Sequence, residues 1–192
     1  TVTYHFTILN TGNAQEKMDY TVTSSWNVDT PGGSTTLAMG VSDTISVTQT
    51  IPANAGSGDT ESVTFTVING DGSSTSVTTT ANQVYGVTVS AGTLTGLNPG
   101  GSGDLSFTVT NTGNGFDTFI IGHSGVWANA KSEDTMALAS GSSATVDITV
   151  GIPADAASGA SSSIGLSATS SGAASTDSYD VVVASSARSL LI

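Results

Sequence analysis

The chain repeats itself, and this internal repeat limits its fold more than any other feature of the sequence. The tetrapeptide Asn-Thr-Gly-Asn at residues 10–13 recurs at residues 111–114, a shift of 101 positions (111 − 10). Ile-Pro-Ala at residues 51–53 recurs at residues 152–154 with the same shift, and no gap is needed from residue 1 to about residue 68. A fixed period of this length indicates two copies of one folded module.

Beyond residue 68 the two copies are expected to differ. The first copy carries an apparent extra polar hairpin around residues 69–72, after which the shift falls to 94 (179 − 85) and aligns Tyr85 with Tyr179. This alignment predicts a first domain over residues 1–90, a second over residues 91–183 and a C-terminal segment over residues 184–192.

Apolar side chains occupy alternate positions within each copy, which is the period of a half-buried β-strand. Gly- and Asn-rich clusters break these runs at the spacing of tight turns. Short strands in modules of about 95 residues favour an all-β fold of two tandem immunoglobulin-like antiparallel β-sandwiches. Each module is expected to bury its own tryptophan, Trp26 or Trp127. The clearest alternating residues are Tyr4, Phe6 and Ile8 in the first copy and Leu105, Phe107 and Val109 in the second.

The two modules have unequal ends. Residues 90–98 precede the strand at residues 105–110 in the second copy, whereas Thr1 aligns with Ser102, so the first module is expected to lack its first strand. At the shift of 94, residues 184–192 match a first strand without a domain of its own. We expect this segment to fill the vacancy in another copy. The predicted donor residues are Ala187, Leu190, Leu191 and Ile192, and the predicted acceptor groove is lined by Tyr4, Phe6 and Ile8.

Donation between copies predicts a polymer. Nine extended residues reach about 30 Å, less than the separation expected for self-closure between two sandwiches stacked end to end. A head-to-tail contact is heterologous, so it propagates into an open helical fibre unless the rotation closes a ring. The expected partner is therefore a second copy of the chain, in a helical filament of identical subunits.

The composition excludes several classes of partner. With 15 acidic and 3 basic residues the formal charge is -12, so a nucleic-acid backbone or an anionic lipid surface would be repelled. The longest apolar run, residues 181–184, is far shorter than the ~18 residues of a membrane span, so membrane insertion is not expected. The absence of cysteine excludes disulfides and thiolate chemistry. The start at Thr1 without Met suggests a removed secretion signal and a secreted, extracellular or cell-surface location.

No enzymatic site is expected. Gly-His-Ser-Gly at residues 122–125 lacks the Gly-x-Ser-x-Gly spacing of a nucleophile turn. Neither histidine has a second one at ligand spacing, and we expect no catalytic residue, no metal site and no cofactor. Calcium at a subunit junction stays open, because several carboxylates lie close in sequence without the spacing of a calcium loop. These carboxylates are the pairs Glu133 and Asp134, Asp59 and Glu61, and Asp104 and Asp117.

The second copy resembles a class of known repeats. Residues 107–119, Trp127, residues 138–146 and Ile-Pro-Ala-Asp-Ala at residues 152–156 are similar to the CARDB-like and alpha-galactosidase-associated repeats of bacterial and archaeal surface proteins. The resemblance covers nearly all of the second copy, and the first copy matches less fully. It implies an immunoglobulin-like fold, an extracellular setting and a scaffolding or adhesive role.

These features together predict a structural subunit of an extracellular filament, a pilus-like thread or tube on a prokaryotic cell, that polymerises through its C-terminal strand. The alternative is a repeat segment of a long adhesin or surface-layer stalk, acting as a spacer or binding module, whose neighbouring domain supplies the strand in cis. A third reading, an auxiliary carbohydrate-binding domain, has little support because the sequence contains only two tryptophans.

Overall fold

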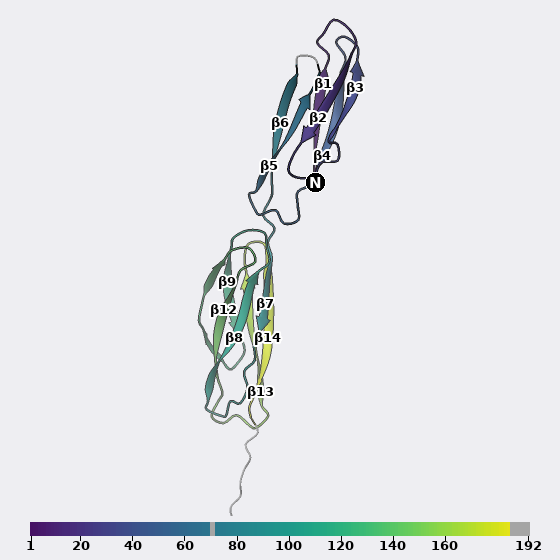
Figure 1. The fold of residues 1–192 in the computed structure, drawn as a ribbon. Helices are drawn as coiled ribbons and strands as arrows, with labels where there is room; N and C mark the ends of the chain where they lie inside the picture. Colours follow the sequence, from purple (N-terminus) through teal and green to yellow (C-terminus); the bar gives the residue numbers. More distant parts are fainter. Residues whose placement is uncertain (70–71, 185–192) are drawn as a thin grey trace, which may run out of the picture. The chain divides into compact units, whose positions relative to one another are not determined.

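The computed structural model describes residues 1–69 and 72–184 (Figure 1). The described residues form fourteen β-strands and no helix. The chain divides into two compact units, Thr1–Asn82 (unit 1) and Gln83–Ile192 (unit 2). The prediction of an all-β chain with two antiparallel sandwich modules is confirmed.

Unit 2 contains two four-stranded antiparallel sheets whose inner faces form one apolar core. Leu105, Phe107 and Val109 point into this core and are fully buried, as the alternating pattern predicts. The first sheet has the order β10 (Ala128–Lys131), β12 (Ser143–Gly151), β8 (Ser102–Asn111) and β7 (Val87–Ala91). The second has the order β11 (Thr135–Leu138), β9 (Asp117–Ser124), β13 (Ser161–Thr169) and β14 (Ala174–Val182).

Unit 1 has a similar arrangement, but its first sheet has two fewer described strands: equivalents of β7 and β10 are missing, and only an isolated bridge joins Val28 to Gln49 where β10 would lie. That sheet has only two described strands, β1 (Val2–Leu9) and β4 (Ser42–Gln49). The other sheet has the order β3 (Gly32–Leu37), β2 (Glu16–Thr23), β5 (Thr60–Val67) and β6 (Ser73–Thr80). The stacked rings of Phe6, Phe65 and Tyr20 form the centre of its core.

The structure corrects the alignment at the shift of 94. Strand β6 pairs with β5 as β14 pairs with β13: Val77 lies opposite Val63, and Tyr179 lies opposite Ile164. Tyr179 therefore corresponds to Val77, so β6 is a strand that both copies share and the first copy has no extra hairpin after β5. The sequence concealed β6 because most of its residues are Ser or Thr.

Strand β7 belongs to unit 2, so the boundary lies before it rather than after residue 90. Its backbone pairs with β8, with Val87 opposite Asn111 and Ala91 opposite Phe107. The first strand of unit 2 thus begins earlier in the chain than the predicted segment 90–98. Within that segment only residues 90 and 91 belong to a strand.

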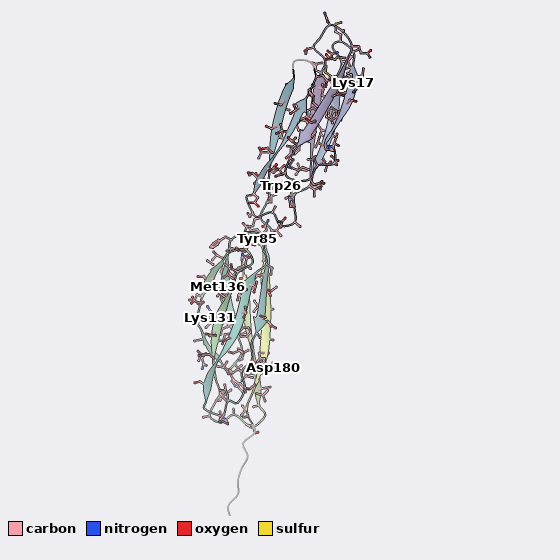
Figure 2. All side chains as sticks on the ribbon, viewed as in Figure 1. Lys17, Trp26, Tyr85, Lys131, Met136 and Asp180 are labelled. Carbon is pink, nitrogen blue, oxygen red and sulfur yellow. The ribbon has the colours of Figure 1, made fainter. Side chains whose placement is uncertain are left out.

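The two tryptophans differ in burial. Trp127 is buried in the core of unit 2, as predicted. Trp26 is only half-buried and lies at one end of unit 1, outside its core cluster (Figure 2). The prediction was wrong for Trp26, because the positions around it carry a polar cluster in unit 1.

The Asn-Thr-Gly-Asn repeat begins with a buried asparagine in each unit. The Asn111 Nδ2 group donates to the carbonyl oxygens of Gly115 and Leu138, both at 2.9 Å, and its Oδ1 accepts from the Gly113 N–H at 2.9 Å. Asn10 makes the matching three bonds in unit 1. A buried amide with all of these partners fixes the turn after the first long strand, since each unmade bond would be costly.

We expect Asn111→Ala to destabilise unit 2 by about 3 kcal/mol, because it leaves buried carbonyl groups without donors. Asn10→Ala should have the same effect on unit 1. Denaturant unfolding of the full chain, followed by tryptophan fluorescence, measures both. The exposed Asn27→Ala is the control and should change little. A loss below about 0.5 kcal/mol for Asn111→Ala would contradict the role of this side chain.

Candidate strand-acceptor site

The outer edge of β1 carries backbone groups that β4 does not reach. The Asn10 N–H donates to the Val41 carbonyl at 3.0 Å, which places the even-numbered residues of β1 in hydrogen-bonded pairs with β4. The odd-numbered residues, Thr7 and Leu9 among them, therefore turn their N–H and C=O groups away from β4. Within residues 1–69 and 72–184, no strand pairs with this edge.

Strand β7 occupies the corresponding edge in unit 2. It pairs with β8, and two bonds flank the ladder: the Thr112 N–H donates to the Gly86 carbonyl at 3.0 Å, and the Gly92 N–H to the Ser106 carbonyl at 2.8 Å. Figure 1 shows β7 beside β8 and β14 in this unit. The first sheet of unit 2 is thus closed by β7 on the side where unit 1 is open.

The other side of β7 is held by side chains of β14. The Val89 N–H donates to the Ser175 hydroxyl at 3.1 Å, and the Ala91 N–H donates to the Asp177 carboxylate at 2.8 Å. By the pairing of β5 with β6, these positions correspond to Ser73 and Thr75 in unit 1. Unit 1 therefore offers hydroxyl acceptors where unit 2 binds its edge strand.

An open groove of about 490 Å³ lies along this edge of unit 1. Its floor is apolar, and its two walls are the backbone of β1 and the Ser- and Thr-rich start of β6. The groove is the space that the equivalent of β7 would fill. It is lined by residues 6–12, Glu16, Met18, Phe65, Val67, Asn69 and residues 72–75.

The core of unit 1 is correspondingly less covered. Tyr4 and Ile45 are only half-buried, whereas Leu105 and Val146 at the same positions of unit 2 are fully buried. Nine described residues form the buried cluster of unit 1, and seventeen form that of unit 2. A strand laid into the groove would contact Phe6, Ile8 and Val67, whereas Tyr4 and Ile45 lie outside the groove lining.

The predicted acceptor residues do not all lie in the groove. Phe6 and Ile8 line it, whereas Tyr4 lies outside its lining and bonds to Thr79 instead. The predicted donor residues Ala187, Leu190, Leu191 and Ile192 lie outside the described residues. Sequence reasoning missed the wall formed by β6, whose only signal was the alternation of Thr75, Val77 and Thr79.

A chain of polar groups, centred on the buried Gln49 and Thr79, lies in unit 1 outside the groove lining. The Tyr4 hydroxyl lies 2.6 Å from the Thr79 hydroxyl, which donates to the Gln49 Oε1 atom. Gln49 is fully buried, and its Nε2 group donates to the Ser24 hydroxyl at 2.8 Å. Because every member is hydrogen-bonded, the cluster is compatible with burial. The positions of Tyr4, Gln49 and Thr79 are occupied in unit 2 by Leu105, Val150 and Val181.

Glu61 ends this chain at the surface. Its carboxylate accepts from the Ser25 N–H at 2.6 Å and from the Ser24 hydroxyl at 3.4 Å. The backbone N–H of Ser25 is the largest cause that lowers the pKa of Glu61, with the side-chain bonds adding to it. These bonds stabilise the ionised carboxylate in the folded state.

We expect the contribution of Glu61 to stability to vary with pH. Because its folded pKa is lowered, the contribution is fully present above the unfolded value of about 4.3 and is lost as the pH falls through the folded pKa. Glu61→Gln should therefore destabilise unit 1 at pH 7 and have a smaller effect at pH 3. Denaturant unfolding at both pH values tests this; an equal effect at both would contradict it.

A second hollow, of about 480 Å³, lies over β9, β13 and β14 of unit 2. It contains His123, Ser124 and Asp177, but no hydrogen bond joins these three side chains among the described residues. The Asp177 carboxylate accepts from the Ala91 and Ser178 N–H groups instead. This arrangement holds β7 in place and does not form a nucleophile with its base.

Three of the carboxylates considered for calcium bond to other protein groups. Asp59 accepts from the Gly56 N–H, Asp104 from the Thr149 hydroxyl and Asp134 from the Lys131 ammonium group. No group of three potential metal ligands occurs among residues 1–69 and 72–184. The same described residues contain no helix long and apolar enough to cross a membrane.

Solved structures with similar folds are distant. The chain matches red sea bream transglutaminase at 9% identity and a TM-score of 0.34, covering 96% of the chain and 29% of the transglutaminase. The complex of the chaperone CsuC with the tip adhesion subunit CsuE from Acinetobacter baumannii matches at 11% identity and a TM-score of 0.32, with coverage of 93% and 90%. A protein of unknown function from Porphyromonas gingivalis W83 matches at 12% identity and a TM-score of 0.37, with coverage of 94% and 90%. Scores this low carry no functional argument.

No curated protein sequence matches the chain. The family model described as the VWA7 Ig-like domain matches residues 86–186. The match begins just before β7 and runs past β14, so it covers the whole sandwich of unit 2 and more than half of the chain. The chain therefore belongs to the VWA7 Ig-like domain family.

Proposed function

We propose that the chain is a structural subunit of an extracellular, cell-surface filament that assembles head-to-tail. In this proposal, the segment that follows Ala184 in one copy enters the groove of unit 1 in the next and pairs with the free edge of β1. The open β1 edge beside a groove lined in part by the apolar residues Phe6, Ile8, Met18 and Phe65 is the observation that carries the proposal. The CARDB-like resemblance supports a scaffolding role, and the proposal assigns no catalytic step.

Unit 2 supports this proposal as an internal example of a filled groove. There the five residues of β7 pair with β8, and alternate side chains pack against the core. The groove of unit 1 extends over the same stretch, from Phe6 to Asn10. An edge strand of this length is therefore sufficient to complete unit 1.

The energy of such an insertion is moderate. Burying two large aliphatic side chains gives about 1.5 to 3 kcal/mol each, and each ladder hydrogen bond adds about 1 kcal/mol. The loss of translational and rotational freedom offsets much of this gain. The free edge adds a further drive, because an unpaired strand edge above an open core promotes association until it is covered.

The second candidate is a repeat segment of a long surface adhesin or stalk. It is favoured by β7 itself, which reaches its groove from the residues that precede the sandwich in the same chain. A strand supplied in cis from upstream residues would fill unit 1 in the same way. The two candidates differ in whether the donor is residues 184–192 of a second copy.

Removal of residues 185–192 is expected to abolish fibre formation. The deletion begins after Ala184 because the Ala184 N–H donates to the Leu97 carbonyl at 3.1 Å within unit 2. Electron microscopy of the full and shortened chains compares their assembly. A peptide of residues 184–192 should raise the melting temperature of the shortened chain. Fibres of unchanged form from the shortened chain would contradict donation by this segment.

A further inference from the structure

One end of the groove in unit 1, which we call its mouth, is formed by the Asn-Thr-Gly-Asn loop at residues 10–13 and by Glu16. The matching loop of unit 2 binds a segment of the chain. In unit 2 the Asn-Thr-Gly-Asn loop at residues 111–114 binds the residues that lead into β7. The Val84 N–H donates to the Asn114 Oδ1 atom at 2.7 Å, and the Asn114 N–H donates back to the Val84 carbonyl at 3.1 Å. This loop therefore forms a turn and also binds the backbone of the residues that precede β7.

The same loop in unit 1 is uncovered. Residues 11–15 are all exposed, whereas Gly113 in the occupied loop is buried. Asn10 and Gly12 are needed for the turn itself, but the Asn13 side chain has no hydrogen-bond partner within the described part of the chain. Asn13 thus matches Asn114 in type and position but lacks a partner equivalent to the Val84 backbone.

The occupied loop also requires a small residue at one point. A Cβ atom on Gly86 would lie 2.5 Å from the Thr112 hydroxyl and 3.1 Å from the Gly113 nitrogen. Thr11 and Gly12 occupy these positions in unit 1. A segment that enters unit 1 in the same way needs glycine immediately before its strand, or a small residue together with a turn of the exposed Thr11 side chain.

The end of unit 1 that carries this mouth is unusually apolar. Leu9, Met39 and Val41 are exposed at this end. They lie next to the loop, since the Val41 carbonyl and the Gly40 N–H both bond to the backbone of Asn10. The same positions in unit 2 hold Thr110, Ser140 and Ser142. Exposed apolar side chains gathered at one place mark an interaction surface.

Glu16 adds a charge to the mouth. It lines the groove and lies opposite Leu37, whose carbonyl accepts from Asn10. Its carboxylate has no hydrogen-bond or ion-pair partner in the described residues. Residues 184–192 contain one charged side chain, Arg188. The mouth and the segment are therefore complementary in charge.

Resting on the proposed function, we propose that this mouth sets the register of the donor segment of a second copy. Ala187 takes the place of Gly86, with the exposed Thr11 side chain turned away from its methyl group, so that the five residues 188–192 replace the five of β7. Arg188 then faces Glu16, and the backbone of Ser185 lies at Asn13. Leu190 and Ile192 take the inward positions of Val89 and Ala91, opposite Ile8 and Phe6, while Leu191 faces outward.

The test is the binding of labelled peptides of residues 184–192 to the chain that ends at Ala184. Asn13→Ala should weaken binding about five- to tenfold, as expected for the loss of one hydrogen bond. Asn114→Ala, the matched change in the occupied loop of unit 2, should leave binding unchanged. Glu16→Gln should weaken binding about two- to fivefold, and Glu133→Gln, which removes an exposed charge in unit 2, should not.

A charge swap and a face test complete the experiment. A peptide with Arg188→Glu should bind the unchanged chain poorly and regain affinity for the Glu16→Lys chain. Leu190→Asp should reduce affinity at least 100-fold, while Leu191→Asp should change it less than about threefold. If the changes at Asn13 and Glu16 and the charge swap leave peptide affinity unchanged, the proposed register is wrong. The register is also wrong if binding requires Leu191 rather than Leu190. Both outcomes leave the proposed function intact. Complete absence of binding by the unchanged peptide overturns both.

Discussion

The structure and the proposed assembly depend on one interaction, which is backbone pairing along the outer edge of the first long strand of each unit, β1 or β8. An extended backbone has hydrogen-bonding groups on two sides, and an edge strand beside an open core is prone to pair with another strand. Unit 2 meets this need with β7, which bonds to β8 through its backbone and to β14 through Ser175 and Asp177. Unit 1 presents the same row on β1 beside an apolar groove, and its function is best understood from that difference.

Much of the fold could be predicted from the sequence because the module occurs twice. Alternation in residues 4–8 and 105–109 identifies β1 and β8 and the side chains that face inward. The repeated loops at residues 10–13 and 111–114 identify the turns that follow them. The alternation of apolar and polar residues assigns each strand and its inner face without tertiary information, and the Asn- and Gly-rich loop marks where the strand ends.

Other parts of the site could not be predicted, for physical reasons that differ between residues. Strand β6 is mainly Ser and Thr, so its strand character depends on pairing with β5 rather than on an apolar face. Val87 and Val89 resembled the end of one module, although backbone pairing places them at the start of the next. Trp26 was expected in a core, but Gln49 and Thr79 make the neighbouring interior polar.

The central claim is that the edge of β1 is unpaired in a single chain and paired in the assembled form. Residue-specific amide hydrogen exchange measures this directly, with Thr108 and Thr110 as the matched amides that pair with β7. The account predicts rapid exchange for Thr7 and Leu9 in the chain that ends at Ala184, and protection similar to that of Thr108 and Thr110 in fibres. Slow exchange of Thr7 and Leu9 in single chains, equal to that of their matched amides, would show that the edge already has a partner and would contradict the account.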